Sequence, residues 1–101
     1  MLRSVPKPRR IRDPEYLVHV RSMPCCVCTH LGERQQTRTE AHHVKTRRSG
    51  GGDDTTAPFC GRHHEMFHLI GRKSFLLRFD FDALMYAERL WEAWTLHGWA
   101  A

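Results

Sequence analysis

The stretch FCGRHHEMFH at residues 59–68 decides the fold expected of this chain, because it concentrates three histidines and a cysteine in one short segment. Two related stretches lie upstream: PCCVC at residues 24–28 and EAHHV at residues 40–44. Imidazole nitrogens and thiolate sulfurs are the ligands that zinc prefers in proteins. Together, the three stretches predict two separate metal sites within a short chain.

The cysteines predict a structural zinc site. Cys25 and Cys28 are separated by two residues, and so are Cys60 and His63. This spacing lets two ligand atoms from one tight turn reach the same ion, and two such pairs complete the tetrahedron of a structural zinc. Cys26 is interpreted as a small buried thiol, because a single residue separates it from Cys28. The alternative is that Cys26 is itself a ligand.

The other histidines predict a second site for a divalent metal. His64 and His68 are four residues apart, which places both imidazoles on one face of a helix. His42 could complete a three-histidine site from a preceding strand, where its neighbour His43 would point to the opposite face. Zn, Ni, Mn and Mg are the candidate ions. The alternative is that these histidines extend one larger zinc cluster or are ordinary surface residues.

Composition favours a globular domain with a polyanionic partner. The chain has 101 residues, of which 27% are charged and 41% hydrophobic, and its formal net charge is +5. Most basic residues are arginine, whose planar fork suits phosphate oxygens. Nucleic acid, in the first instance DNA, is therefore the expected partner. The alternative is a small basic protein that binds no polyanion.

Local signals predict an α+β domain at residues 13–101 behind a basic arm at residues 1–12. The run Asp13-Pro14-Glu15 begins a helix that should end near Ser22, before Pro24. A polar loop is expected at residues 29–38. The other predicted elements are strands at 39–45 and 56–59, a flexible glycine-rich connection at 47–54, and helices at 62–70 and 82–97. Trp91 and Trp94 are expected to pack in the core.

No apolar run approaches the roughly 18 residues that cross a membrane. The basic N-terminus is not followed by an apolar signal core. A cytoplasmic protein without a membrane partner is therefore expected. Paired disulfides are not expected, because three of the four cysteines fall within residues 25–28.

These motifs resemble those of the HNH, or ββα-metal, nuclease superfamily. The resemblance is to small phage and prophage HNH proteins in particular, including the recombination-enhancement nuclease group. The matching segments are PCCVC, EAHHV, a glycine-rich turn with an aspartate, APFCGRHHEMFH and GRKSF, within about residues 16–95. The resemblance implies a zinc-stabilised ββα core with flanking helices, and metal-dependent hydrolysis of DNA phosphodiester bonds.

The resemblance also implies a role for each histidine. His42 would bind the catalytic metal, and His43 would be the general base. His64 occupies the final histidine position of the motif, and His68 matches an additional ligand of histidine-rich members such as the colicin nucleases. The sequence departs from the family pattern at Thr55, near the middle asparagine, and at His63, where the usual knuckle has a second cysteine.

Phosphodiester cleavage also needs positive charge near the phosphate. Arg47 and Arg48 are the candidates nearest the base, with Arg62 behind them; a solvated basic turn is the alternative. Glu40 could orient a histidine or an arginine. Two other functions compete with a nuclease: a non-cleaving nucleic-acid-binding zinc module on the same scaffold, and a protein-interaction zinc domain. The second would explain the cysteine site but not the three-histidine site.

Overall fold

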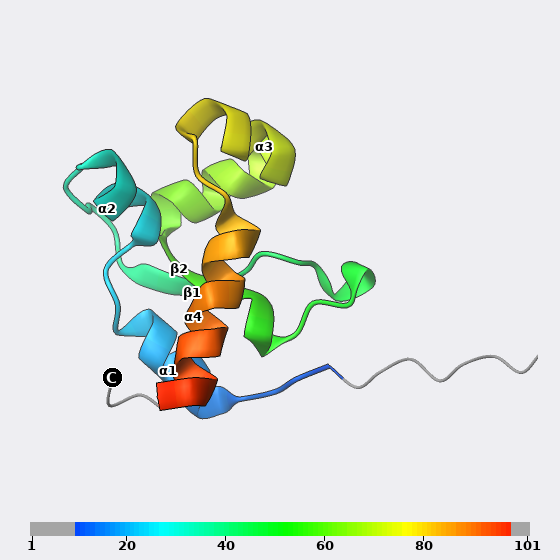
Figure 1. Ribbon diagram of the computed structural model, residues 1–101. Helices are drawn as coiled ribbons and strands as arrows, with labels where there is room; N and C mark the ends of the chain where they lie inside the picture. The colour runs from blue at the N-terminus through cyan, green and yellow to red at the C-terminus, as the bar shows by residue number, and fades with distance from the viewer. Residues whose placement is uncertain (1–9, 98–101) are drawn as a thin grey trace, which may run out of the picture.

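The structure, a computed structural model, describes residues 10–97, and the side chain of Arg47 lies outside that description. It is an α+β fold built on one antiparallel strand pair (Figure 1). Strand β1 (Thr39–His43) pairs with β2 (Thr56–Cys60), with His42 opposite Ala57 and Thr39 opposite Cys60. Helix α3 (Gly61–Phe79) follows β2 without an intervening loop. Residues 1–9 of the expected basic arm lie outside the described residues.

The two strands differ in burial: β2 is buried along its whole length, whereas β1 has both buried and exposed residues, and its two histidines differ in exposure. All five residues of β2 are buried. Along β1, Thr39 and His42 are buried while Glu40 and His43 are exposed. Consecutive side chains of a strand point to opposite faces, so His42 and His43 lie on different faces of β1. The adjacent His42 and His43 therefore lie in different environments, as the expected strand required.

Helix α1 (Pro14–Arg21) begins where the sequence predicts. The side chain of Asp13 accepts a hydrogen bond from the backbone N–H of Tyr16 at 3.1 Å, and Pro14 occupies the first turn. The helix ends at Ser22. The N-cap and the proline two residues beyond the end are both local signals, which is why this helix could be predicted.

Helix α2 (Cys26–Leu31) corrects the expected polar loop, which was predicted to begin at residue 29. The Sγ of Cys25 caps the helix by accepting a hydrogen bond from the backbone N–H of Cys28 at 3.5 Å. Gly32, with φ of 67°, ends it. A helix of six residues is too short to show a hydrophobic period, so the sequence pattern could not reveal it.

Helix α3 is interrupted at Gly71, whose φ of 83° and ψ of 166° are not helical. The predicted end of a helix at Gly71 therefore marks a real break, but a second segment continues from Arg72 to Phe79. That segment returns Phe75 to the core, where its ring lies 5.3 Å from the ring of Phe67 and 5.7 Å from that of Phe59.

Helix α4 (Ala83–His97) crosses the strand pair and ends beside α1 (Figure 1). The rings of Trp91 and Trp94 lie 4.9 Å and 5.4 Å from the ring of Tyr16, which is fully buried. The two tryptophans therefore pack against a core residue, but both are half-buried and lie outside the core cluster in which they were expected. Among residues 10–97, no helix combines the length and the apolar character that crossing a membrane needs.

The β1–β2 connection contains two short 3-10 helices, η1 (Arg47–Ser49) and η2 (Asp53–Thr55). Hydrogen bonds within the connection fold it back on itself: the carbonyl of Thr46 accepts from Gly51 N at 2.9 Å, and that of Thr55 from Val44 N at 2.8 Å. The flexibility expected of this connection stays a prediction. A Cβ on Gly51 would lie 2.1 Å from the carbonyl oxygen of Lys45. Glycine is therefore required for this close approach.

Candidate metal centres

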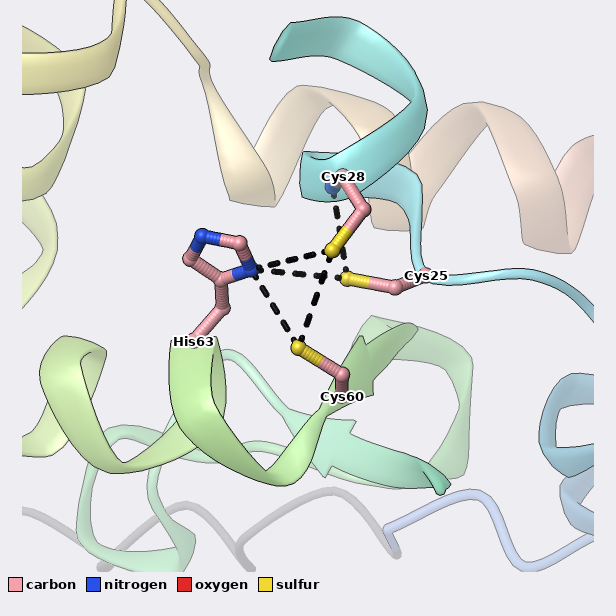
Figure 2. Close-up of side chains that lie close together, drawn as sticks. All are labelled: Cys25, Cys28, Cys60 and His63. Atoms are coloured by element: carbon pink, nitrogen blue, oxygen red, sulfur yellow. Dashed lines mark hydrogen bonds between the residues drawn. The ribbon is translucent and has the colours of Figure 1, made fainter. Parts of the chain in front are cut away.

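Four ligand atoms converge where α2, β2 and α3 meet (Figure 2). They are the Sγ atoms of Cys25, Cys28 and Cys60 and the Nδ1 of His63, all within 4.8 Å of one another. Two sulfurs, those of Cys28 and Cys60, are 3.8 Å apart. The imidazole nitrogen lies 3.8, 3.5 and 3.3 Å from the sulfurs of Cys25, Cys28 and Cys60.

These distances fit a tetrahedral zinc. Zn–S bonds of about 2.3 Å and Zn–N bonds of about 2.0 Å place ligand atoms about 3.8 Å (S–S) and about 3.5 Å (S–N) apart at tetrahedral angles. The four residues are almost completely buried, with 0–3% of each exposed. The cluster can hold a metal ion and is consistent with structural zinc.

The local structure explains why these four side chains meet. Cys25 and Cys28 begin α2, Cys60 ends β2, and His63 lies in the first turn of α3. The structure thus brings together the four residues that the two spacings predict. Cys26 is buried among the core residues and is not in the cluster, and burial raises the pKa of its thiol. Its surroundings match the interpretation of a packed thiol.

Burial also sets the protonation of the cluster. It raises the pKa of the Cys28 thiol to about 12 and, together with the charge of Arg62, lowers the pKa of His63. Burial acts in the same upward direction on Cys60, but the backbone N–H of His63 and other hydrogen bonds lower the pKa of that thiol overall. A neutral imidazole can donate its lone pair to a metal. Thiolates at such a depth need a bound cation to offset their lost hydration.

A second group of ligand atoms lies where β1 meets α3. It comprises ring nitrogens of His42, His64 and His68, again within 4.8 Å of one another. The Nε2 atoms of His64 and His68 are 2.9 Å apart, as the four-residue spacing on α3 predicts. The ring of His42 lies 4.4 Å from that of His64. The three histidines expected to share an ion are therefore neighbours.

His42 is the unusual member of this group. Its side chain is fully buried, and neither ring nitrogen has a hydrogen-bond partner among residues 10–97. Burial, followed by the nearby His64 and His68, lowers its pKa to about 3, so the ring is neutral. A buried polar group without a partner costs about 1–3 kcal/mol. A metal ion bound to the nitrogen that carries the lone pair would remove that cost for this nitrogen.

Glu40 orients one of the three histidines. The Nδ1–H of His64 donates to the Oε1 of Glu40 at 2.8 Å, which leaves Nε2 facing His68. A carboxylate that holds the far nitrogen of a histidine is the usual outer partner of a metal ligand. The expectation that Glu40 could orient a histidine agrees with this contact.

His43 lies outside the three-histidine group, at the exposed end of β1. Its Nε2–H donates to the Oδ1 of Asp53 at 2.9 Å, and 45% of its side chain is exposed. The Oδ2 of Asp53 accepts from the backbone N–H of Asp13 at 2.7 Å. Burial raises the pKa of Asp53, but the hydrogen bonds from His43 and Asp13 outweigh it and lower the pKa overall.

Sequence reasoning missed Asp53. The only signal was an aspartate after the glycine-rich turn, and nothing in the sequence showed that this turn returns to His43. Thr55, which stands near the expected asparagine, is buried, and its carbonyl accepts from Val44 N at 2.8 Å. The backbone at Thr55 therefore braces the residue that follows His43.

A cavity of about 430 Å³ lies beside these histidines. Its lining includes His42, His43 and His68, together with two cations, Lys45 and Arg72. Neither cation was predicted from the sequence. The break at Gly71 positions Arg72, and no local pattern identifies that effect.

The predicted arginines lie elsewhere. Arg62 donates from Nη2 to the Oε2 of Glu33 at 2.7 Å, and the same oxygen lies 3.8 Å from the Nε2 of His63. Arg62 therefore flanks the cysteine cluster and does not line the cavity beside His43. Arg48 is exposed in η1 and does not line it either. Arg47 belongs to the same short helix, but its side chain is not described.

Comparison with known proteins gives no further guidance. The chain matches no protein-family model, and neither curated proteins nor solved structures gave a significant match.

Proposed function

We propose that this protein is a metal-dependent HNH endonuclease of phage or prophage type that hydrolyses DNA phosphodiester bonds. The observation that carries the proposal is one cavity with two kinds of histidine. His42 and His68 belong to a group of three that can hold an ion, whereas His43 is held apart by Asp53. A metal-binding group beside a metal-free base is the arrangement that phosphodiester hydrolysis needs.

The contacts of His43 assign its two nitrogens. Because Asp53 has a lowered pKa, its carboxylate is ionised near neutral pH and accepts the Nε2–H. The lone pair is then on Nδ1. In the proposed reaction, Nδ1 takes the proton of the attacking water while its oxygen bonds to phosphorus and the leaving oxygen departs. Asp53 keeps the ring in this tautomer and stabilises the positive charge it acquires.

The three-histidine site supplies the second requirement. A divalent ion bound there would neutralise charge on the phosphate in the transition state. His42, His64 and His68 would hold that ion, and Glu40 would keep His64 in the orientation that directs Nε2 toward it. Lys45 and Arg72, from the cavity lining, would add positive charge near the same phosphate.

Two competing functions fit these contacts less well. A non-cleaving nucleic-acid-binding zinc module was suggested by Thr55 in place of asparagine, but the backbone of Thr55 provides a brace next to His43. A protein-interaction zinc domain needs the cysteine cluster only. It gives no reason for His42 to be buried without a partner or for Asp53 to hold His43.

Nicking of supercoiled plasmid tests the proposal. The purified protein is incubated with plasmid and, in turn, Zn, Ni, Mn or Mg, and open-circle product is quantified. We expect metal-dependent nicking that an excess of chelator stops. A His64→Ala protein should lose it, while His97→Ala, at the exposed end of α4, should keep it. Absence of nicking with every metal, by a folded protein that binds the ion, would refute the nuclease function.

A further inference from the structure

A second cavity also borders His43. Its volume is about 220 Å³, and its lining includes Arg10, Arg12 and Asp53. His43 and Lys45 line both this cavity and the larger one that contains His68 and Arg72. The base proposed above therefore borders two neighbouring cavities that share part of their lining.

The wall of the smaller cavity is built by close backbone contacts. The backbone N–H of Asp53 donates to the carbonyl of Ile11 at 2.9 Å. A Cβ on Gly52 would lie 2.8 Å from the backbone N and O of Ile11, so only glycine allows residues 10–12 to approach this closely. The chain thus holds Arg10 and Arg12 beside the same turn that carries Asp53.

Both cavities are positively charged. Lys45 and Arg72 line the larger one, and none of the described residues in its lining is acidic. Arg10, Arg12 and Lys45 line the smaller one, where the single acid, Asp53, already accepts hydrogen bonds from His43 and Asp13. A nucleic-acid strand carries a negative charge at every phosphate, so cations in two neighbouring cavities can contact successive phosphates of one strand.

We propose that the two cavities are successive phosphate subsites for one nucleic-acid strand that crosses His43. Arg72 contacts phosphate on one side of the bond to be cut, Arg12 contacts phosphate on the other side, and Lys45 lies between them. The inference rests on the proposed function for the identity of the cut bond. It adds that the enzyme needs nucleotides on both sides of that bond, which makes terminal cleavage unfavourable.

Binding, rather than cleavage, tests this strand path. Affinity of the zinc-loaded full chain for a fluorescent single-stranded DNA is measured over a range of salt, with no metal added for the second site. Arg72→Ala and Arg12→Ala should each weaken binding several-fold and lower the slope of log affinity against log salt by about 0.7. Lys73→Ala and Arg21→Ala are the matched controls, because both residues are exposed and line neither cavity.

A second measurement locates each contact. A series of oligonucleotides carries one neutral methylphosphonate at successive positions. A replacement should weaken binding of the unmutated protein only where it removes the charge of a phosphate that the protein contacts. Arg72→Ala should abolish the effect at one position, and Arg12→Ala at another, on opposite sides of the bond that the protein cuts. Arg72→Gln and Arg12→Gln repeat the test if an alanine variant misfolds.

The outcomes separate the two proposals. If Arg72→Ala and Arg12→Ala bind as the controls do, or abolish the effect at the same phosphate, the strand path is wrong even though the protein cuts DNA. If the two phosphates differ as expected but no metal supports nicking, the strand path stands as a binding site and the nuclease function falls.

Discussion

At the scale of the residue, His42 and His43 are adjacent in sequence and opposite in environment. His42 is fully buried, with two nitrogens that have no partner among the described residues, whereas His43 is about half exposed and donates a hydrogen bond to Asp53. Strand alternation produces this division, because consecutive side chains in a strand point to opposite faces. One histidine is thereby available as a ligand and the other as a base, without any change of backbone.

His43→Ala should separate metal binding from cleavage. The variant should keep the second metal and its affinity for DNA, but nick plasmid about 10²–10⁴-fold more slowly, the usual contribution of a positioned base. His97→Ala serves as the control for loss of an imidazole. Nicking at the unmutated rate, measured at equal metal occupancy, would show that His43 is not the base.

Asp53 gives a prediction about stability and pH. Its pKa is lower in the folded protein than the unfolded value of about 3.9. A group of this kind contributes stability that is present above the unfolded pKa and is lost as pH falls through the folded pKa. Urea unfolding between pH 6 and pH 3 should therefore show a steeper loss of stability below about pH 4 for the unmutated protein than for Asp53→Asn. Parallel curves would contradict this role of the carboxylate.

At the scale of the element, the two halves of α3 depend on Gly71. Its φ of 83° with an extended ψ is a conformation almost restricted to glycine, although a Cβ there would meet no atom within 4 Å. Gly71→Ala should lower the free energy of unfolding by about 1–3 kcal/mol through backbone strain alone. Gly61→Ala is the control, since its added Cβ would make only ordinary contacts, the nearest at 3.5 Å. Equal stability of both variants in urea denaturation would contradict the strain.

The elements that sequence could predict are those with local signals. The cap at Asp13, the paired ligand spacings and the alternation around His42 are all contained in a few consecutive residues. Helix α2 has no period, and the segment after Gly71 forms because Phe75 packs against Phe59 and Phe67. Such elements are fixed by contacts between distant parts of the chain, which a local pattern does not contain.

The residues of the candidate site likewise fall into those that local sequence signals predict and those that depend on distant contacts. Spacing predicted the cysteine cluster and the three histidines, because most of their ligands come in pairs three or four residues apart in the sequence. Asp53 and Arg72 were missed because a long connection and a broken helix carry them to the site. Thr55 acts through its carbonyl, so its side-chain identity could not indicate its contact with Val44.

At the scale of the whole molecule, the two clusters share one helix end. His63 faces the cysteines and His64 faces His42, so consecutive residues of α3 belong to different sites. The cysteine cluster also ties α2 and β2 to this turn. An ion in the cysteine cluster would therefore fix the start of α3, and with it the position of His64 and His68.

Loss of the cysteine cluster should consequently abolish both sites. Structural zinc contributes on the order of 10 kcal/mol to domains of this kind. Cys60→Ala should lose tightly bound zinc, unfold by circular dichroism, and fail to bind an ion at His42, His64 and His68. Cys26→Ala is the matched control: that thiol is equally buried but outside the cluster, so the variant should keep its zinc and its fold. Metal analysis after mild chelation measures the zinc content of the two variants, and circular dichroism measures their fold. A Cys60→Ala protein that stays folded with a full complement of zinc would show that these four residues do not hold the ion, and that α3 is positioned by its packing against β2 alone.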